Sequence, residues 1–178
     1  PVPSLGFGFG VDLFRYFAFN DPEWDYSQYD FSTWAKDMRL TGSTLNALET
    51  ALSAFRERGG KLIIWHGWAD AALSATATIN YYEDVLKDNE DAEAFTRLYL
   101  IPGCDHCGGG PGVSGVDWIA TIADWVENDK APGVIVATKP GNSGEPDMTR
   151  PLAPFPKQVE YIAGGDPDSA DGFRVVEP

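Results

Sequence analysis

The sequence predicts an α/β protein in which parallel β-strands are flanked by helices. Two short, continuous apolar runs at residues 61–67 and 97–103 have the pattern of strands buried on both faces of a sheet. Amphipathic helical patterns precede, separate and follow these runs, and this order is typical of parallel strands joined by right-handed crossovers. Because two strands alone make a poor parallel sheet, we expect a segment outside this chain to complete it.

Three helices are expected around the strands. One apolar stripe over residues 43–58, with spacings of three and four, predicts the first helix. The stripe consists of Leu45, Leu48, Leu52 and Phe55. Ser74 is a candidate N-cap for a second helix that reaches about residue 87. A third amphipathic pattern covers residues 116–128.

The chain is expected to fall into three regions. Residues 1–42 read as an irregular segment, with a strand or short helix over residues 14–19. Residues 43–139 should form the α/β core. Residues 140–178 should form a tail that wraps over the core, and its first part, residues 140–156, is rich in Pro, Gly and polar side chains. One further strand is expected at residues 134–138.

Composition and charge exclude two classes of partner. The 178 residues include 27 acidic and 13 basic side chains, which give a formal net charge of −14. No Lys/Arg cluster is present to neutralise a phosphate backbone, and no apolar run approaches the roughly 20 residues that span a bilayer. We therefore expect neither nucleic acid nor a membrane as a partner.

Residues that can perform chemistry follow both predicted strands. His-Gly-Trp-Ala-Asp occupies residues 66–70, and Gly-Cys-Asp-His-Cys occupies residues 103–107. In open α/β sheets this carboxyl edge is where ligands bind. A serine nucleophile needs an imidazole base and a carboxylate that orients the imidazole, and Asp70 and His106 fit these two roles. In α/β hydrolases the order along the chain is Ser, Asp, His, and the spacing here suits the last two members.

These motifs resemble those of the tannase and feruloyl esterase family. The similar stretches are residues 60–70, residues 101–112 and Asp-Trp-Val-Glu at residues 124–127. The resemblance implies the C-terminal part of an α/β-hydrolase fold, completed by a segment outside this chain. It also implies a carboxylic ester hydrolase, a serine esterase acting on aromatic-acid esters such as feruloyl or galloyl esters. Residues 1–42 would then be the end of the lid region returning to the core.

The resemblance further implies a disulfide and a partner segment. In this family the Cys after the catalytic His bonds to the Cys before the catalytic Ser, which transfers to His106 and Cys107. Neither a Gly-x-Ser-x-Gly motif nor a Cys-Ser pair occurs in the sequence. We therefore expect an N-terminal segment with the Cys-Ser nucleophile motif as partner. Such a disulfide needs an oxidising compartment, so the protein is expected to be secreted.

The residues near Asp70 and His106 include candidates for a substrate pocket. Trp68 and Leu73 flank Asp70 and are candidates for lining the pocket of an aromatic ester substrate. In the family an apolar residue usually stands where this chain has Cys104. We expect no metal or cofactor in this chain, and any structural calcium ion belongs to the lid region outside it.

Alternative interpretations remain open at this point. Asp70 could serve only as the acceptor of a turn or helix N-cap, and His66 is expected to be a hydrogen-bonded core histidine. Cys104 and Cys107 also form a Cys-x-x-Cys motif, which could be a redox motif or half of a zinc site. The whole chain could also be a non-catalytic interaction module that kept hydrolase motifs.

Overall fold

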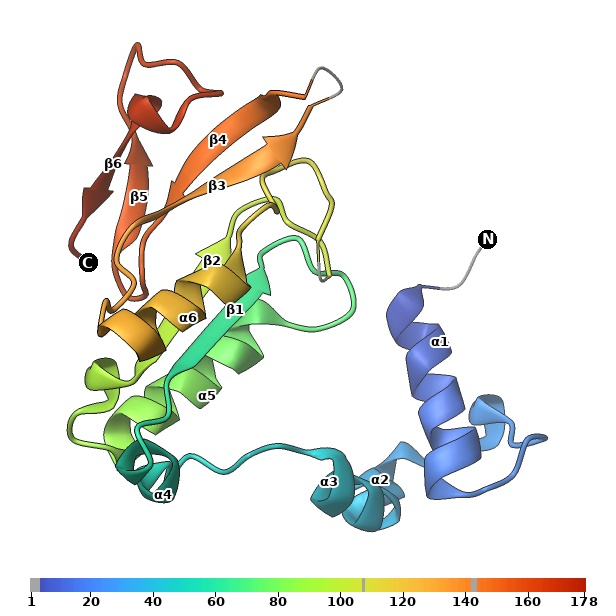
Figure 1. The fold of residues 1–178 in the computed structure, drawn as a ribbon. Helices are drawn as coiled ribbons and strands as arrows, with labels where there is room; N and C mark the ends of the chain where they lie inside the picture. Colours follow the sequence, from blue (N-terminus) through green and yellow to red (C-terminus); the bar gives the residue numbers. More distant parts are fainter. Residues whose placement is uncertain (1–3, 107, 142–143) are drawn as a thin grey trace. The chain divides into compact units, whose positions relative to one another are not determined.

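The structure of the chain is a computed structural model that describes residues 4–106, 108–141 and 144–178. It contains two compact units, residues 1–49 and residues 50–178 (Figure 1). None of the helices in the described ranges is long and apolar enough to cross a membrane.

The second unit contains the two predicted parallel strands. Strand β1 (Leu62–Gly67) pairs with β2 (Thr96–Ile101), and the strands are in register along their whole length. Helix α5 (Ala75–Asp88) connects them (Figure 1). The prediction of parallel strands joined by a helix is therefore confirmed.

Side chains alternate along β1 between two helices, because successive residues of a strand point to opposite faces. Trp65 stacks on Trp118 of helix α6 (Trp118–Asn128), with ring centroids 5.9 Å apart. The next residue, His66, contacts Thr78 of α5. The two helices therefore cover opposite faces of the strand pair (Figure 1).

The predicted helix boundaries at α5 and α6 agree with the structure to within two residues. At the start of α6, the Asp117 carboxylate accepts a hydrogen bond from the Ala120 amide at 2.8 Å, which caps the helix. Ser74 occupies the predicted N-cap position of α5 with an extended backbone, but its side chain makes no capping hydrogen bond. The position was thus predicted correctly and the capping interaction was not.

The single helix predicted over residues 43–58 is wrong. Helix α3 (Arg39–Leu45) ends early, and helix α4 (Ser53–Glu57) begins after a stretch without regular structure. Leu48, in the middle of the predicted apolar stripe, is 70% exposed.

A side chain far along the sequence explains this break. Asn89, at the C-cap of α5, is buried and donates hydrogen bonds to the carbonyls of Thr50 and Val85, both at 2.8 Å. Its Oδ1 accepts a hydrogen bond from the Leu52 amide at 3.2 Å. These bonds occupy backbone groups that a continuous helix would use, so a tertiary contact overrides the local pattern.

The first unit is built from short helices around aromatic rings. Helix α1 (Leu5–Asp12) continues into a π-helical stretch (Leu13–Ala18), so the segment read as strand or short helix is helical. Helix α2 (Trp34–Asp37) follows after two 3-10 turns. Ring centroids 4.8–5.9 Å apart join four aromatic residues, namely Phe14, Phe19, Trp24 and Tyr29. The assignment of residues 1–42 to the end of a lid region stays a prediction.

The C-terminal residues form two antiparallel pairs. Strand β3 (Ile135–Pro140) confirms the strand predicted at residues 134–138 and pairs with β4 (Pro146–Leu152). Strands β5 (Gln158–Tyr161) and β6 (Phe173–Val176) form the second pair. The tail was predicted without strands, because its Pro, Gly and polar residues hide the short alternating segments.

The tail also contacts the parallel strand pair. The Phe155 amide donates a hydrogen bond to the Leu98 carbonyl of β2 at 2.8 Å, and Tyr99 forms an isolated antiparallel bridge with Pro154. The edge of β2 that faces away from β1 is thus covered by residues 154–155.

Candidate active site

The loop after β1 places Asp70 beside the end of β2. The Trp68 amide donates to the Ile101 carbonyl at 2.9 Å, and the Ala69 amide donates to the Cys104 carbonyl at 3.0 Å. These two bonds fix the loop to the residues that follow β2, because parallel strands end at the same edge.

The loop after β2 is a tight, glycine-rich turn. Gly103 and Gly110 have φ angles of +71° and +86°, a left-handed conformation that favours glycine. The Gly112 amide donates to the Gly103 carbonyl at 2.9 Å and closes the loop. His106 is therefore carried by a loop whose two ends are fixed to each other.

Gly67 lies where the two loops come closest. A Cβ atom at this position would lie 2.3 Å from the Cys104 carbonyl oxygen and 2.6 Å from the Asp105 carbonyl oxygen. Any side chain would force these loops apart, so the His-Gly-Trp-Ala-Asp motif requires a glycine at its second position.

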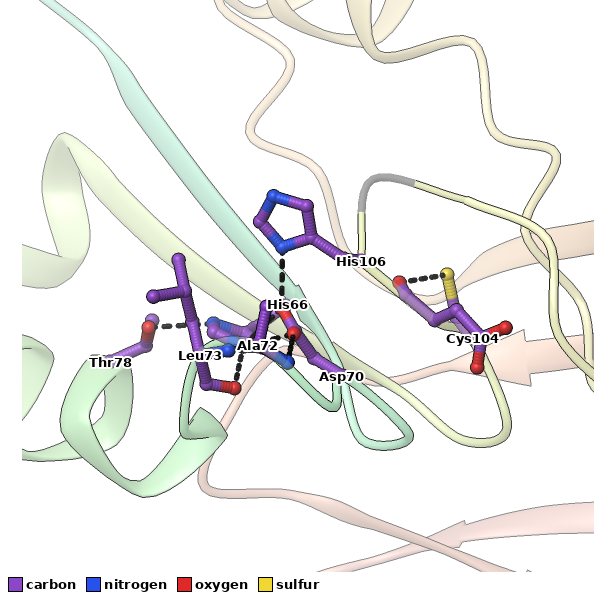
Figure 2. Close-up of polar contacts among 8 residues, drawn as sticks. His66, Asp70, Ala72, Leu73, Thr78, Cys104 and His106 are labelled. Carbon is purple, nitrogen blue, oxygen red and sulfur yellow. Dashed lines mark hydrogen bonds and ion pairs between the residues drawn. The ribbon is translucent and has the colours of Figure 1, made fainter. Parts of the chain in front are cut away.

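This arrangement brings together the two residues that the sequence assigned to catalysis. The distance from His106 Nδ1 to Asp70 Oδ2 is 2.7 Å (Figure 2). The Asp70 side chain is 4% exposed and the His106 side chain is 50% exposed. Since an ionised carboxylate only accepts, His106 Nδ1 carries the proton and donates it to Asp70. The second ring nitrogen, Nε2, points away from Asp70 (Figure 2).

The other oxygen of Asp70 is held by backbone amides. Asp70 Oδ1 accepts hydrogen bonds from the amides of Ala72 and Leu73 at 2.7 and 2.8 Å. The bond from Leu73, followed by the bond from His106, lowers the pKa of Asp70 from its ordinary 3.8 to about 2, although burial opposes this shift. The turn interpretation and the catalytic interpretation of Asp70 are therefore compatible, because each uses a different oxygen.

His66 has the hydrogen bonds expected of a core histidine. Its Nδ1 lies 2.7 Å from Thr78 Oγ1, and its Nε2 lies 3.3 Å from the Leu73 carbonyl oxygen. Its Nε2 also lies 3.3 Å from Asp70 Oδ2, a contact that sequence reasoning missed. The spacing of four residues between His66 and Asp70 across a tight turn was the available signal.

Of the two cysteines, only Cys104 lies among the residues that the structure describes. Cys104 is fully buried in an apolar cluster with Tyr99 and Ile101, and its thiol donates to the Asp105 carbonyl at 3.3 Å. Cys107 lies outside the described residues, so its predicted disulfide and the Cys-x-x-Cys alternative stay untested. In residues 4–106, 108–141 and 144–178, no three His, Cys, Asp or Glu side chains are grouped so as to hold a metal ion.

The two pocket candidates are separated in the structure. Trp68 is half exposed and lines a cavity of about 760 Å³, together with Leu100 of β2 and Phe155 of the tail. Leu73 is 58% exposed and does not line that cavity. The structure thus gives Trp68 an apolar surrounding, while Leu73 stays on the surface beside Asp70.

The fold and the site together define an α/β protein with a hydrogen-bonded Asp–His pair at the carboxyl edge of parallel strands. A family model described as "Tannase and feruloyl esterase" matches residues 10–176. The chain therefore belongs to the tannase and feruloyl esterase family, and the resemblance drawn from the sequence motifs is confirmed.

Relatives and solved structures agree with this membership. The chain is 38% identical to mono(2-hydroxyethyl) terephthalate hydrolase of Piscinibacter sakaiensis, over 88% of this chain and 27% of that protein. It is 30% identical to feruloyl esterase B of Aspergillus niger, over 89% of this chain and 34% of that protein. The chain thus spans about a third or less of the length of these relatives.

The fold is shared with solved esterases. An esterase from Aspergillus oryzae superposes with a TM-score of 0.85 at 24% identity, over 94% of this chain and 37% of that chain. Feruloyl esterase B from Aspergillus oryzae gives a TM-score of 0.82 at 23% identity, over 93% of this chain and 36% of that chain.

Proposed function

We propose that the protein containing this chain is a serine carboxylic ester hydrolase, and that this chain supplies the Asp and His of its catalytic triad. The observation that carries the proposal is the 2.7 Å hydrogen bond between Asp70 Oδ2 and His106 Nδ1, with His106 Nε2 directed away from the carboxylate. A buried carboxylate paired with a half-exposed imidazole is the arrangement that a serine nucleophile needs.

In this mechanism His106 acts as base and then as acid. Its Nε2 takes the proton from the serine hydroxyl as the serine oxygen attacks the ester carbonyl. The tetrahedral intermediate then collapses, the bond to the alcohol breaks, and Nε2 returns the proton to the leaving alcohol. Water, activated in the same way, releases the acid from the acyl-enzyme.

Asp70 fixes the tautomer and orientation of His106. Accepting the Nδ1 proton leaves the lone pair of Nε2 available, and the negative charge stabilises the imidazolium that forms. Because the pKa of Asp70 is lowered to about 2, the carboxylate remains ionised at every pH at which an esterase operates.

The serine is proposed to come from an upstream segment that completes an α/β-hydrolase fold. The chain matches only 27–37% of the length of the relatives and structures named above. Among the described residues, β1 pairs on one edge only, with β2, so its outer edge can accept a further strand. We further propose that Cys107 bonds to a cysteine next to that serine, which would fix the nucleophile beside His106.

Esters of aromatic acids are the proposed substrates. The supporting observations are the names of the relatives, which include feruloyl esterases and a terephthalate monoester hydrolase, and the apolar cavity at Trp68. Feruloyl and galloyl esters are the first compounds to assay. The proposed disulfide needs an oxidising environment, so the protein is proposed to be secreted.

Labelling of the full-length protein with a fluorophosphonate tests this proposal. We expect one serine to be modified, on a peptide in which cysteine precedes that serine. His106→Ala should slow the labelling about 10³-fold or more, while Asp105→Ala, an exposed change in the same loop, should leave the rate unchanged. Labelling of His106→Ala at the wild-type rate would exclude His106 as the base.

Peptide mapping without reduction tests the proposed disulfide separately. The peptide that contains Cys107 should be found linked to the peptide that carries the labelled serine. Alkylation of Cys107 in the unreduced, folded protein would show that this link does not exist.

A further inference from the structure

His66 lies on the buried side of the Asp70 carboxylate. Its side chain is 10% exposed, and both ring nitrogens have partners. Nδ1 faces the Thr78 hydroxyl of α5 at 2.7 Å. Nε2 lies 3.3 Å from the Leu73 carbonyl oxygen and 3.3 Å from Asp70 Oδ2 (Figure 2).

These partners place a proton on Nε2 of His66. Carbonyl and carboxylate oxygens can only accept hydrogen bonds, so Nε2 carries a proton. It donates this proton to the Leu73 carbonyl and lies 3.3 Å from Asp70 Oδ2. The Thr78 hydroxyl can donate to or accept from Nδ1 at 2.7 Å, so this contact does not change the assignment of Nε2 as a donor. His66 thus presents its Nε2 proton to the Leu73 carbonyl and to Asp70.

We infer that His66 is a positioning residue that holds the Asp70 carboxylate in the orientation required by His106; this inference rests on the proposed function. Two backbone amides hold Asp70 Oδ1, while Oδ2 is met by His66 from the interior and by His106 from the exposed side. The donor from β1 limits rotation of the carboxylate about its Cβ–Cγ bond. Oδ2 therefore stays directed at the exposed side of the site, where His106 lies.

A matched pair of variants of the full-length protein tests this role. Gln and Met have similar length and flexibility, but only Gln can donate a hydrogen bond at the position of Nε2. We expect His66→Met to lower kcat for an aromatic ester about tenfold or more, with KM changed less than about threefold. His66→Gln should restore kcat to within about threefold of the wild type.

Thr78→Val provides the control for the contact with α5. It removes the hydroxyl at Nδ1 but leaves the Nε2 proton facing Asp70, so its loss of kcat should be much smaller than that of His66→Met. Equal losses in Thr78→Val and His66→Met, or equal losses in His66→Gln and His66→Met, would overturn the inference. Equal losses in His66→Gln and His66→Met would show that His66 acts only through packing, and equal losses in Thr78→Val and His66→Met would show that the Nε2 donor is not the group that matters.

A measurement on the wild-type protein needs a variant only for the assignment of its signals. Nitrogen-15 NMR of labelled histidine, assigned by the signals that disappear in His66→Gln, should show a proton on His66 Nε2. The absence of a proton from Nε2 would overturn the inference, since Nε2 would then present a lone pair to Asp70. If His106→Ala hydrolysed esters normally, the proposed function would fail, while the tautomer would still report on the contact between His66 and Asp70.

Discussion

The Ala69 amide donates a hydrogen bond to the Cys104 carbonyl at 3.0 Å, and this bond ties the loop that carries Asp70 to the loop that carries His106. It forms where two parallel strands end side by side, so the fold itself brings the aspartate and the histidine together. The close approach leaves no room for a side chain at Gly67.

Gly67→Ala should therefore reduce both stability and activity. The new Cβ would overlap the carbonyl oxygens of Cys104 and Asp105, and relieving such overlap costs about 1–3 kcal/mol. Displacing the His106 loop by even about 1 Å should lower kcat about 10²-fold. Urea unfolding and ester hydrolysis of the full-length protein measure the two effects. Gly133→Ala is the matched control, because nothing lies within 4 Å of its Cβ and its φ is not positive. Equal losses of stability and kcat in the two variants would show that the close approach at Gly67 is not their cause.

Acid should destabilise the wild type more than Asp70→Asn. The pKa of Asp70 in the folded protein is lowered to about 2 from 3.8, so its stabilising contribution is complete above pH 3.8. That contribution is lost as the pH falls through about 2, because the carboxylate then takes up a proton and loses its donors. Asn cannot titrate, so the stability difference between the two proteins should shrink between pH 4 and pH 2. Melting temperatures of both proteins, measured between pH 4 and pH 2, test this prediction. A difference in melting temperature that stays constant over this range would show that Asp70 is not stabilised as an anion.

Asn89→Ala should lower stability and leave catalysis intact. The substitution leaves one buried carbonyl, one part-buried carbonyl and one amide without their partner, which costs roughly 2–3 kcal/mol. Urea unfolding should show the loss, while kcat per folded molecule stays near the wild-type value because Asn89 lies at the opposite end of α5 from Asp70. Asn128→Ala is the control, since Asn128 is exposed and its side chain donates to Asp124 on the surface of α6. A loss of unfolding free energy in Asn128→Ala as large as that in Asn89→Ala would show that the hydrogen bonds of Asn89 are not the cause of the loss.

Trp68→Ala and Leu73→Ala separate the two pocket candidates. If the cavity at Trp68 receives the aromatic acid, Trp68→Ala should raise KM for a feruloyl ester about tenfold and change acetate ester hydrolysis far less. Leu73→Ala should have a smaller effect, because Leu73 lies outside that cavity. Steady-state kinetics with paired feruloyl and acetyl esters measure the difference. Ile119→Ala, an exposed change on α6, should alter neither KM; unchanged selectivity in Trp68→Ala would remove this cavity from the proposal.

The sequence was sufficient to predict the centre of the fold, because there local and tertiary preferences agree. Continuous apolar runs predicted β1 and β2, and amphipathic periodicity predicted α5 and α6. The order of the motifs then placed Asp70 and His106 at one edge, since parallel strands end together.

The remaining parts depend on contacts that local patterns do not encode. The break between α3 and α4 is caused by Asn89, which lies more than 30 residues further along the chain. Strand β4 contains Pro146 and Pro151, and β5 and β6 have only four residues each, so their pairing depends on partners found only in the fold. The contact between His66 and Asp70 requires the turn geometry itself.

The most direct measurement is kcat for ester hydrolysis by the full-length protein with Asp70→Asn, compared with Asp105→Asn. The substituted asparagine would present a neutral amide to His106 and favour the wrong tautomer, so kcat should fall about 10³- to 10⁴-fold. Asp105 is exposed in the neighbouring loop, and its substitution should leave kcat within about twofold of the wild type. Turnover of Asp70→Asn near the wild-type rate would contradict the assignment of Asp70 and His106 as members of a catalytic triad.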